Sequence, residues 1–286
     1  MACDICGCGG SNIYMGLLPN FKNKFIGVRY RYSEFHTTLA GDPTQFSHNY
    51  YNTFELWSGW NIGKRWQVLA FVPYYSNRQM DDDGSSSKNG LGDITLLVNY
   101  QLLHSRKSTA SANTIEQILW IGGGIKLPTG SFKLDLRDSN TTVADINAQI
   151  GTGSTDFLVN LMHDLRINMF GINTSVTYKI NTANSSGYRY GNKLMANVIG
   201  YYRLRFAGIA VSPNAGVIFE NTEANHYADA KVQYTGGHVL SAVAGVEVSY
   251  DRIAIGFNVQ HALAQDYAGG QTKMQFRGMA HISFAF

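Results

Sequence analysis

Residues 274–286 read MQFRGMAHISFAF, and apolar side chains alternate along them with polar or small ones. One face of this stretch carries Phe276, Ala280, Ile282, Phe284 and Phe286. The other face carries Gln275, Arg277, His281, Ser283 and Ala285. A period of two predicts a β-strand with one apolar face. Because the apolar face is rich in aromatic residues and the stretch stops on one, it is typical of the closing strand of an outer-membrane β-barrel.

The same alternation recurs about a dozen times upstream, which is the pattern expected when each strand has a lipid face and a lumen face. The predicted strands are 25–35, 53–62, 66–75, 93–102, 117–127, 156–163, 170–180, 193–204, 209–220, 239–250, 253–263 and 275–286. The total is even, as bacterial barrels of this type require. We therefore predict an all-β fold, an integral antiparallel barrel of about 12 strands.

The predicted connections fall into two classes. Those near residues 63, 166, 205 and 251 are short, whereas those at 37–50, 77–90, 129–152, 181–190, 221–236 and 266–272 are long and polar. Short turns face the periplasm in such barrels and long loops face outward. Pro73 and Pro213 fall inside predicted strands, where proline normally occurs at bulges or edges, so we expect bulges there.

Composition agrees with a membrane barrel. Of the 286 residues 13% are aromatic and only 15% are charged, and no run of about 18 apolar residues could form a transmembrane helix. The strands of a water-soluble β-sandwich also alternate between apolar and polar side chains. In such a sandwich, however, the apolar side chains would not all face the same way on every strand. The net charge of +3 is spread along the chain, so no nucleic-acid partner is predicted. We interpret residues 1–20 as an N-terminal periplasmic segment and residues 21–286 as the barrel.

The N-terminal segment carries the pattern C-x-x-C-x-C, formed by Cys3, Cys6 and Cys8, and the chain has no other cysteine. Thiolates at this spacing can converge on a soft ion, so Cu(I) or Zn(II) is the cofactor the pattern suggests. Three alternatives stay open. Two of the thiols could form a disulfide, Cys3 could carry a lipid, or the segment could act as a passive plug. No signal peptide precedes these cysteines, so we read the sequence as a mature chain.

Alternation also predicts which side chains face the lumen. The candidate lumen-lining residues are Arg29, Arg31, Glu55, Trp57, Phe71, Asp93, Trp120, Lys126, Asp156, Lys179, Arg203, Glu247, Arg277 and His281. Confined charges need partners, so we expect Arg29, Arg31 and Arg277 to face Glu55 and Glu247. The apolar members either line a path for an apolar solute or fill a narrow barrel.

Three glycine-containing motifs stand in the middle of the chain: GLGDITL at 90–96, GGGIKLPTGS at 122–131 and GTGSTD at 151–156. In spacing and order they resemble the signatures of a family of outer-membrane transporters labelled meta-pathway phenol degradation. The resemblance implies a β-barrel that takes up small molecules, including hydrophobic ones. From the residues alone, we interpret the motifs as turn-forming sequences at the rim of the barrel and not as a ligand site. Asp93 and Asp156 are the candidate exceptions.

The sequence thus predicts a passive channel for small solutes in the bacterial outer membrane. The alternatives are a protein that handles soft metals through Cys3, Cys6 and Cys8, and a structural or adhesion barrel. No serine, histidine and carboxylate set recommends catalysis, so an enzyme is not expected. The expected partners are membrane lipids with lipopolysaccharide, a small solute, and the barrel-assembly machinery, which would bind the strand that ends at Phe286.

Overall fold

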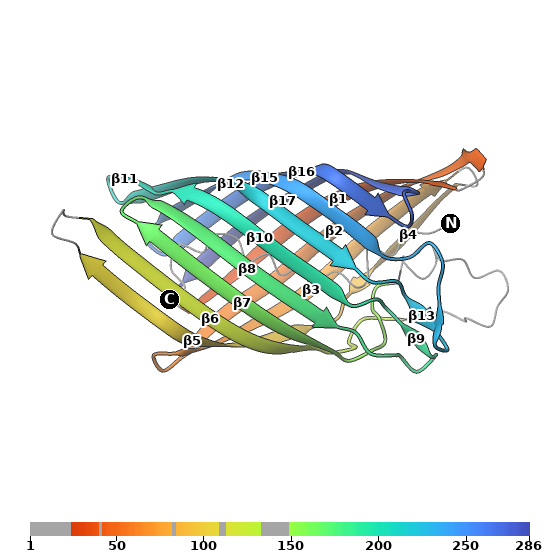
Figure 1. Ribbon diagram of the computed structural model, residues 1–286, viewed down its shortest axis with the longest axis horizontal. Coiled ribbons are helices and arrows are strands. Elements are labelled where there is room, and N and C mark those ends of the chain that lie inside the picture. The colour runs from red at the N-terminus through yellow and green to blue at the C-terminus, as the bar shows by residue number, and fades with distance from the viewer. Residues whose placement is uncertain (1–23, 40–41, 82–83, 109–112, 133–148) are drawn as a thin grey trace.

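The computed structural model describes residues 24–39, 42–81, 84–108, 113–132 and 149–286, and the ribbon in Figure 1 is an elongated barrel of tilted strands. These residues contain no helix long and apolar enough to cross a membrane. The strands are β1 (Phe25–Leu39), β2 (Asp42–Ile62), β3 (Trp66–Asp81), β4 (Gly84–Leu91), β5 (Thr95–Ser108), β6 (Thr114–Lys126), β7 (Asp156–Ile167), β8 (Phe170–Ile180), β9 (Tyr188–Arg189), β10 (Lys193–Tyr202), β11 (Leu204–Phe206), β12 (Ile209–Thr222), β13 (His226–Tyr227), β14 (Ala230–Lys231), β15 (Gly237–Tyr250), β16 (Ile253–Tyr267) and β17 (Thr272–Ala285).

The barrel wall is closed by antiparallel pairing all the way round. Its twelve strands are β1, β2, β3, β5, β6, β7, β8, β10, β12, β15, β16 and β17. The last strand pairs with the first, with Val28 opposite Ile282, and β10 pairs with β12, with Asn197 opposite Ile218. Closure leaves no strand edge unpaired, which is the condition for a sheet to stand in hydrocarbon. The predicted all-β fold with twelve strands is confirmed.

Side chains alternate between the two faces of the wall, as the pleat of a β-strand requires. In β2, Phe54 and Leu56 are each 47% exposed on the outside, while Glu55 and Trp57 between them are 2% and 1% exposed on the inside. The same arrangement puts Ile282 and Phe284 of β17 on the outer surface. An apolar exterior around a polar interior is what a lipid environment selects.

The two ends of the barrel differ in their connections. At one end, here called the turn end, the connections are short: 63–65, 168–169, 203–208 and 251–252. The opposite end, here called the loop end, carries the connections 127–155, 181–192 and 223–236. By the general rule for such barrels the turn end faces the periplasm and the loop end faces outward.

Two predicted loops are strands instead. Residues 37–50 are mostly the tip of the β1–β2 hairpin, and residues 77–90 belong mainly to β3 and β4, which pair from Tyr74–Leu91 to Asp81–Gly84. Their Asn, Ser and Asp side chains suggested loops, but polar residues are acceptable in strands that extend beyond the lipid. The prediction was wrong because the apolar pattern marks the membrane layer and not the end of hydrogen bonding.

The bulge predicted at Pro213 is wrong, because Pro213 faces Val246 with no break in register. At Pro73 the pairing with β2 is regular, with Glu55 opposite, but on the other side the register shifts by one residue between Phe71–Thr95 and Tyr74–Leu91. Each proline lies where its strand changes partner on the other side, from β5 to β4 for Pro73 and between β10 and β11 for Pro213. At such a place the wall needs no amide donor, so proline is tolerated.

A bulge that the sequence did not predict occurs in β17. The register shifts between Glu34 and Phe35, which pair with Phe276 and Met274 respectively, so Gln275 is the extra residue. A bulge shifts the alternation by one residue. Gln275 is therefore exposed on the outside, whereas the sequence placed it with the inward set.

The connections at the loop end form a small folded unit of their own. β9, β13 and β14 make a separate sheet, and Tyr188 and Tyr190 are buried against Phe132 and Val232. Asn225 donates from Nδ2 to the Tyr188 hydroxyl at 2.6 Å. Three connections that are far apart in the sequence are thus packed together beside the barrel mouth, at the right of Figure 1.

Candidate functional site

The predicted lumen-lining side chains lie on the inner face of the barrel. Those that are buried are Arg29, Glu55, Trp57, Phe71, Asp93, Trp120, Lys126, Asp156, Lys179, Glu247, Arg277 and His281. Arg31 is 12% exposed, and Arg203 is partly exposed in the connection between β10 and β11. The strands hold these groups in rows because every second residue of each strand faces inward.

The ion pairs inside the barrel differ in part from those expected. Arg29 and Arg31 both pair with Glu55, the latter at 3.2 Å between Nη2 and Oε2. Arg277 does not pair with Glu247 but with Glu220, which also accepts from Lys193 Nζ at 2.9 Å. The expected pairing of Arg277 was wrong because alternation gives the face of a residue and not its neighbours across a curved wall.

His281 is the partner of Glu247, with Nε2 and Oε2 3.2 Å apart. Its ring also stands edge-on to the indole of Trp57, with the centroids 5.6 Å apart. A polar contact and an aromatic contact therefore fix the same imidazole against the inner wall.

The three glycine-containing motifs meet at one buried cluster near the loop end, here called the Asp93 cluster: Asp93, Lys126, Thr152, Asp156 and Lys179. Lys126 Nζ lies 2.6 Å from Asp93 Oδ2 and 2.9 Å from Asp156 Oδ2. Lys179 Nζ lies 3.5 Å from Asp156 Oδ2, and Thr152 donates to Asp93 from both its amide and its hydroxyl. Each of the three motifs supplies at least one residue of the Asp93 cluster, so the three motifs belong to one structural unit.

Asp93 also binds the end of the second motif. Its Oδ1 accepts a hydrogen bond from the Gly130 amide at 2.9 Å. Next to it, the Thr129 hydroxyl donates to the Gly92 carbonyl and accepts from the Ile94 amide, each at 2.9 Å. The Thr129 hydroxyl thereby serves as hydrogen-bond partner for two backbone groups in the segment between β4 and β5. Thr129, Gly130 and Thr152 were not predicted as site residues, because nothing in the sequence shows which turn folds against which carboxylate.

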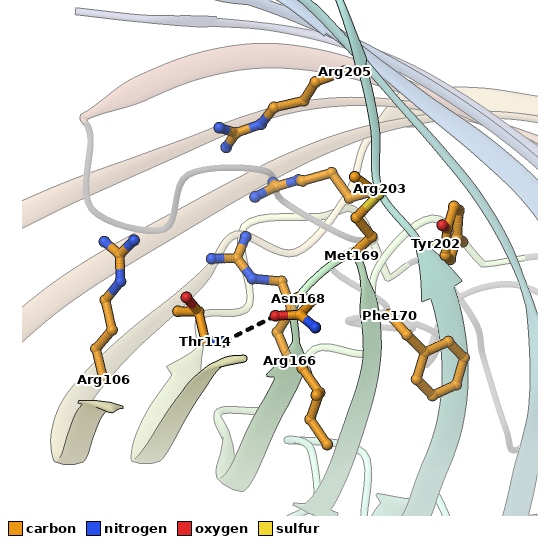
Figure 2. Close-up of a pocket in the computed structure, with 10 residues that line it drawn as sticks. Arg106, Thr114, Arg166, Asn168, Met169, Phe170, Tyr202, Arg203 and Arg205 are labelled. Atoms are coloured by element: carbon orange, nitrogen blue, oxygen red, sulfur yellow. Dashed lines mark hydrogen bonds between the residues drawn. The ribbon is translucent and has the colours of Figure 1, made fainter. Parts of the chain in front are cut away.

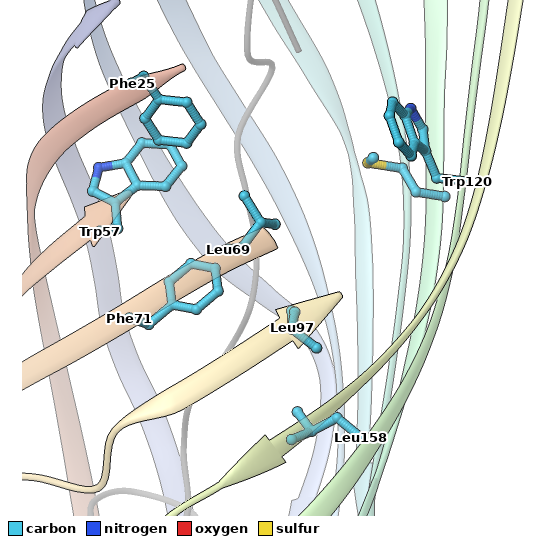
Figure 3. Close-up of a cluster of buried hydrophobic side chains, with 8 residues drawn as sticks. Phe25, Trp57, Leu69, Phe71, Leu97, Trp120 and Leu158 are labelled. Atoms are coloured by element: carbon cyan, nitrogen blue, oxygen red, sulfur yellow. The ribbon is translucent and has the colours of Figure 1, made fainter. Parts of the chain in front are cut away.

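An apolar cluster lines the inner wall further along the barrel (Figure 3). Its buried members are Phe25, Trp57, Leu69, Phe71, Leu97, Trp120, Leu158 and Met162. Phe25 and Trp57 meet edge to face with ring centroids 4.8 Å apart. The Arg29 guanidinium stands 5.2 Å from the ring of Trp57 and 5.7 Å from that of Phe71. Charged and apolar groups are thus interleaved on the inner wall.

At the turn end the interior opens into a cavity of about 900 Å³. Its lining residues are Arg106, Thr114, Arg166, Ile167, Asn168, Met169, Phe170, Tyr202, Arg203 and Arg205. Figure 2 shows the four arginine side chains extending from separate strands and connections toward the same space. The β6 and β7 ends beside them are joined by a hydrogen bond from the Thr114 amide to Asn168 Oδ1 at 2.8 Å.

Sequence reasoning identified only one of these arginines, Arg203. Extending the alternation of β7 and β10 to the ends of their hairpins would have added Arg166 and Arg205. It would not have added Arg106, which faces inward only because the register of β5 shifts between Gln101 and Leu103. In the structure the pKa of Arg203 is lowered, first by burial and then by the nearby charge of Arg166. Arg205 lowers it further.

The predicted metal ligands Cys3, Cys6 and Cys8 lie outside the described residues, as does the segment 1–20 that contains them. Within the residues that are described, no group of three or more His, Cys, Asp or Glu side chains is arranged to hold a metal ion.

Neither a protein-family model nor a curated protein sequence matches this chain. Its fold is similar to that of solved outer-membrane barrels. An outer membrane channel from Pseudomonas putida aligns with a TM-score of 0.63 at 14% identity, over 92% of this chain and 95% of that one. The β domain of the Bordetella autotransporter BrkA aligns with a TM-score of 0.54 at 13% identity, over 92% of this chain and 100% of that one. The closed barrel, its apolar outer face and this shared fold indicate a β-barrel protein of the bacterial outer membrane.

Proposed function

We propose that the protein is a passive channel that lets small molecules cross the outer membrane. The observation that carries the proposal is the cavity of about 900 Å³ inside the turn end of a closed barrel. A barrel that only anchors or adheres has no need for a cavity of this size into which four arginine side chains extend. The cavity has room for a small organic solute, since ligand sites typically measure about 300–1,000 Å³.

The inner wall supports the same proposal. Beyond the cavity the wall carries both ion-paired groups, such as Arg29 with Glu55, and the apolar cluster around Trp57 and Trp120. Selectivity in a channel follows from the size and the polarity of such a lining. The fold shared with an outer membrane channel agrees with this function. In this proposal the protein has no catalytic role.

Liposome swelling tests the proposal. Vesicles that contain the refolded full chain are diluted into isotonic solutions of uncharged sugars of increasing size. If the channel is narrow, we expect the vesicles to swell in pentose solutions and to swell little in trisaccharide solutions. Permeation falls steeply as the size of the sugar approaches the diameter of the lumen. Vesicles with heat-denatured protein serve as the control. Equal behaviour of folded barrels and this control would refute a channel function.

A further inference from the structure

The four arginines of the turn-end cavity come from three hairpins that follow one another round the barrel. Arg106 lies on β5 near the β5–β6 connection, and Arg166 lies near the end of β7. Arg203 and Arg205 lie in and beside β11, between β10 and β12. Because β5 to β8, β10 and β12 are neighbours in the wall, these cations gather on one side of the mouth.

The carboxylates at this mouth are already engaged. Glu116 pairs with Arg166 and with His104, whose Nε2 is 3.2 Å from Oε1. Asp164 accepts hydrogen bonds from the Tyr201 hydroxyl at 3.0 Å and from Asn173 Nδ2 at 3.4 Å. Both acidic groups therefore have donors of their own.

Two of the arginines are left with positive charge facing the cavity. Arg106 and Arg205 are exposed, and among the residues that the structure describes neither forms an ion pair. Arginine binds carboxylates and phosphates through paired N–H donors in a fixed plane. Several guanidinium groups around one space thus form a receptor for an anion, not merely a solvated surface.

Apolar side chains follow directly inside the mouth. On the paired strands β6 and β7, Trp120 lies opposite Met162, and Glu116 lies opposite Arg166. These two pairs are four residues apart on each strand, which is about 13 Å along the strand. The partly buried Ile118 stands between them and packs against the apolar cluster. A solute that spans this distance meets an apolar wall at one end and guanidinium groups at the other.

We propose that the turn-end mouth binds small organic carboxylates that have an apolar body, and that such anions are solutes of the channel. This inference rests on the proposed channel function and specifies its solute class. Arg106 and Arg205 supply the donors for the carboxylate, and Arg166 and Arg203 add positive charge around it.

Planar-bilayer recordings on the refolded full chain test this inference. The reversal potential under a KCl gradient gives the ratio of anion to cation permeability, and benzoate is then added to measure block of the chloride current. The test variant is R106Q combined with R205Q, because neither arginine belongs to an ion pair that the fold needs. R106K with R205K keeps the charge, and R252Q removes an exposed arginine in the β15–β16 turn that does not line the cavity.

We expect a permeability ratio above one for the unmodified protein and for R252Q, and a decrease of about threefold in the double glutamine variant. The concentration of benzoate that halves the current should rise about tenfold in that variant, because charge-assisted hydrogen bonds are lost. The lysine variant should keep the permeability ratio and lose part of the benzoate affinity, since lysine lacks the planar pair of donors.

Two outcomes would overturn the inference while leaving a channel in place: an unchanged ratio in the double glutamine variant, or equal block by benzoate and by neutral benzyl alcohol. A folded barrel that carries no current would overturn the channel function and the inference together.

Discussion

Asp93 holds three segments of the chain together through one buried carboxylate. It is 5% exposed and accepts from Lys126, from Gly130 and from two donors of Thr152. The sequence singled out Asp93 and Asp156 among the motif residues but assigned them no partners. The partners of Asp93 come from a turn 37 residues away and a loop 59 residues away along the chain, and no local pattern encodes such distances.

Replacing Asp93 by asparagine should lower the free energy of unfolding by about 3 kcal/mol. The substitution removes a buried negative charge and leaves Lys126 with only Asp156 as a counter-ion. Urea unfolding of the barrel in lipid vesicles, followed by tryptophan fluorescence, gives the difference. D266N is the matched control, because Asp266 is exposed on β16. A similar decrease in the free energy of unfolding in the two variants would show that the Asp93 cluster does not stabilise the contact between the three motifs.

At the level of single elements, β6 depends on its glycine triplet. A Cβ atom on Gly124 would collide with the Leu97 side chain and with the Leu96 carbonyl. One on Gly122 would strike the amide oxygens of Asn99 and Asn160. Gly123 points to the other face, where the nearest atom, the Leu158 carbonyl oxygen, is 3.7 Å away. The triplet therefore lets neighbouring strands place large side chains over β6 on the inner face only.

Gly124→Ala should destabilise the barrel by about 1–3 kcal/mol, because the new methyl group meets backbone that cannot move away. Gly123→Ala should be neutral to slightly stabilising, since alanine restricts the unfolded chain. The same unfolding assay compares the two variants. An equal effect of both substitutions would mean that the inward and outward faces of β6 are assigned wrongly.

Strand alternation was enough to predict most of the wall from the sequence, and its failures have physical causes. β8 was predicted with its observed bounds, because a strand buried in lipid ends where its apolar face ends. Residues 37–50 were assigned to a loop, because strands that continue into water lose the apolar signal. Gln275 was placed on the wrong face, because a bulge leaves no mark in the composition of a strand.

At the scale of the whole molecule, the barrel is a closed wall with a cationic mouth at its turn end and packed connections at its loop end. The architecture could be predicted, because lipid imposes one rule on every strand. The mouth was not predicted, because β5 and β7 extend beyond their predicted ends at residues 102 and 163, and because a register shift in β5 turns Arg106 inward. The hypothesis that Cys3, Cys6 and Cys8 bind Cu(I) or Zn(II) remains a prediction, which elemental analysis of the purified protein and a triple serine variant would test.

The central claim is that solutes pass through the lumen by way of this mouth, and neighbouring residues of β5 offer a direct test. Arg106 lines the cavity, whereas Lys107 is exposed and does not line it. In a background with Cys3, Cys6 and Cys8 replaced by serine, the variants Arg106→Cys and Lys107→Cys are each treated with a bulky methanethiosulfonate reagent during single-channel recording. The account predicts a lasting drop in current for Arg106→Cys and no change for Lys107→Cys, with labelling of both confirmed by mass. An undiminished current through labelled Arg106→Cys channels would contradict it.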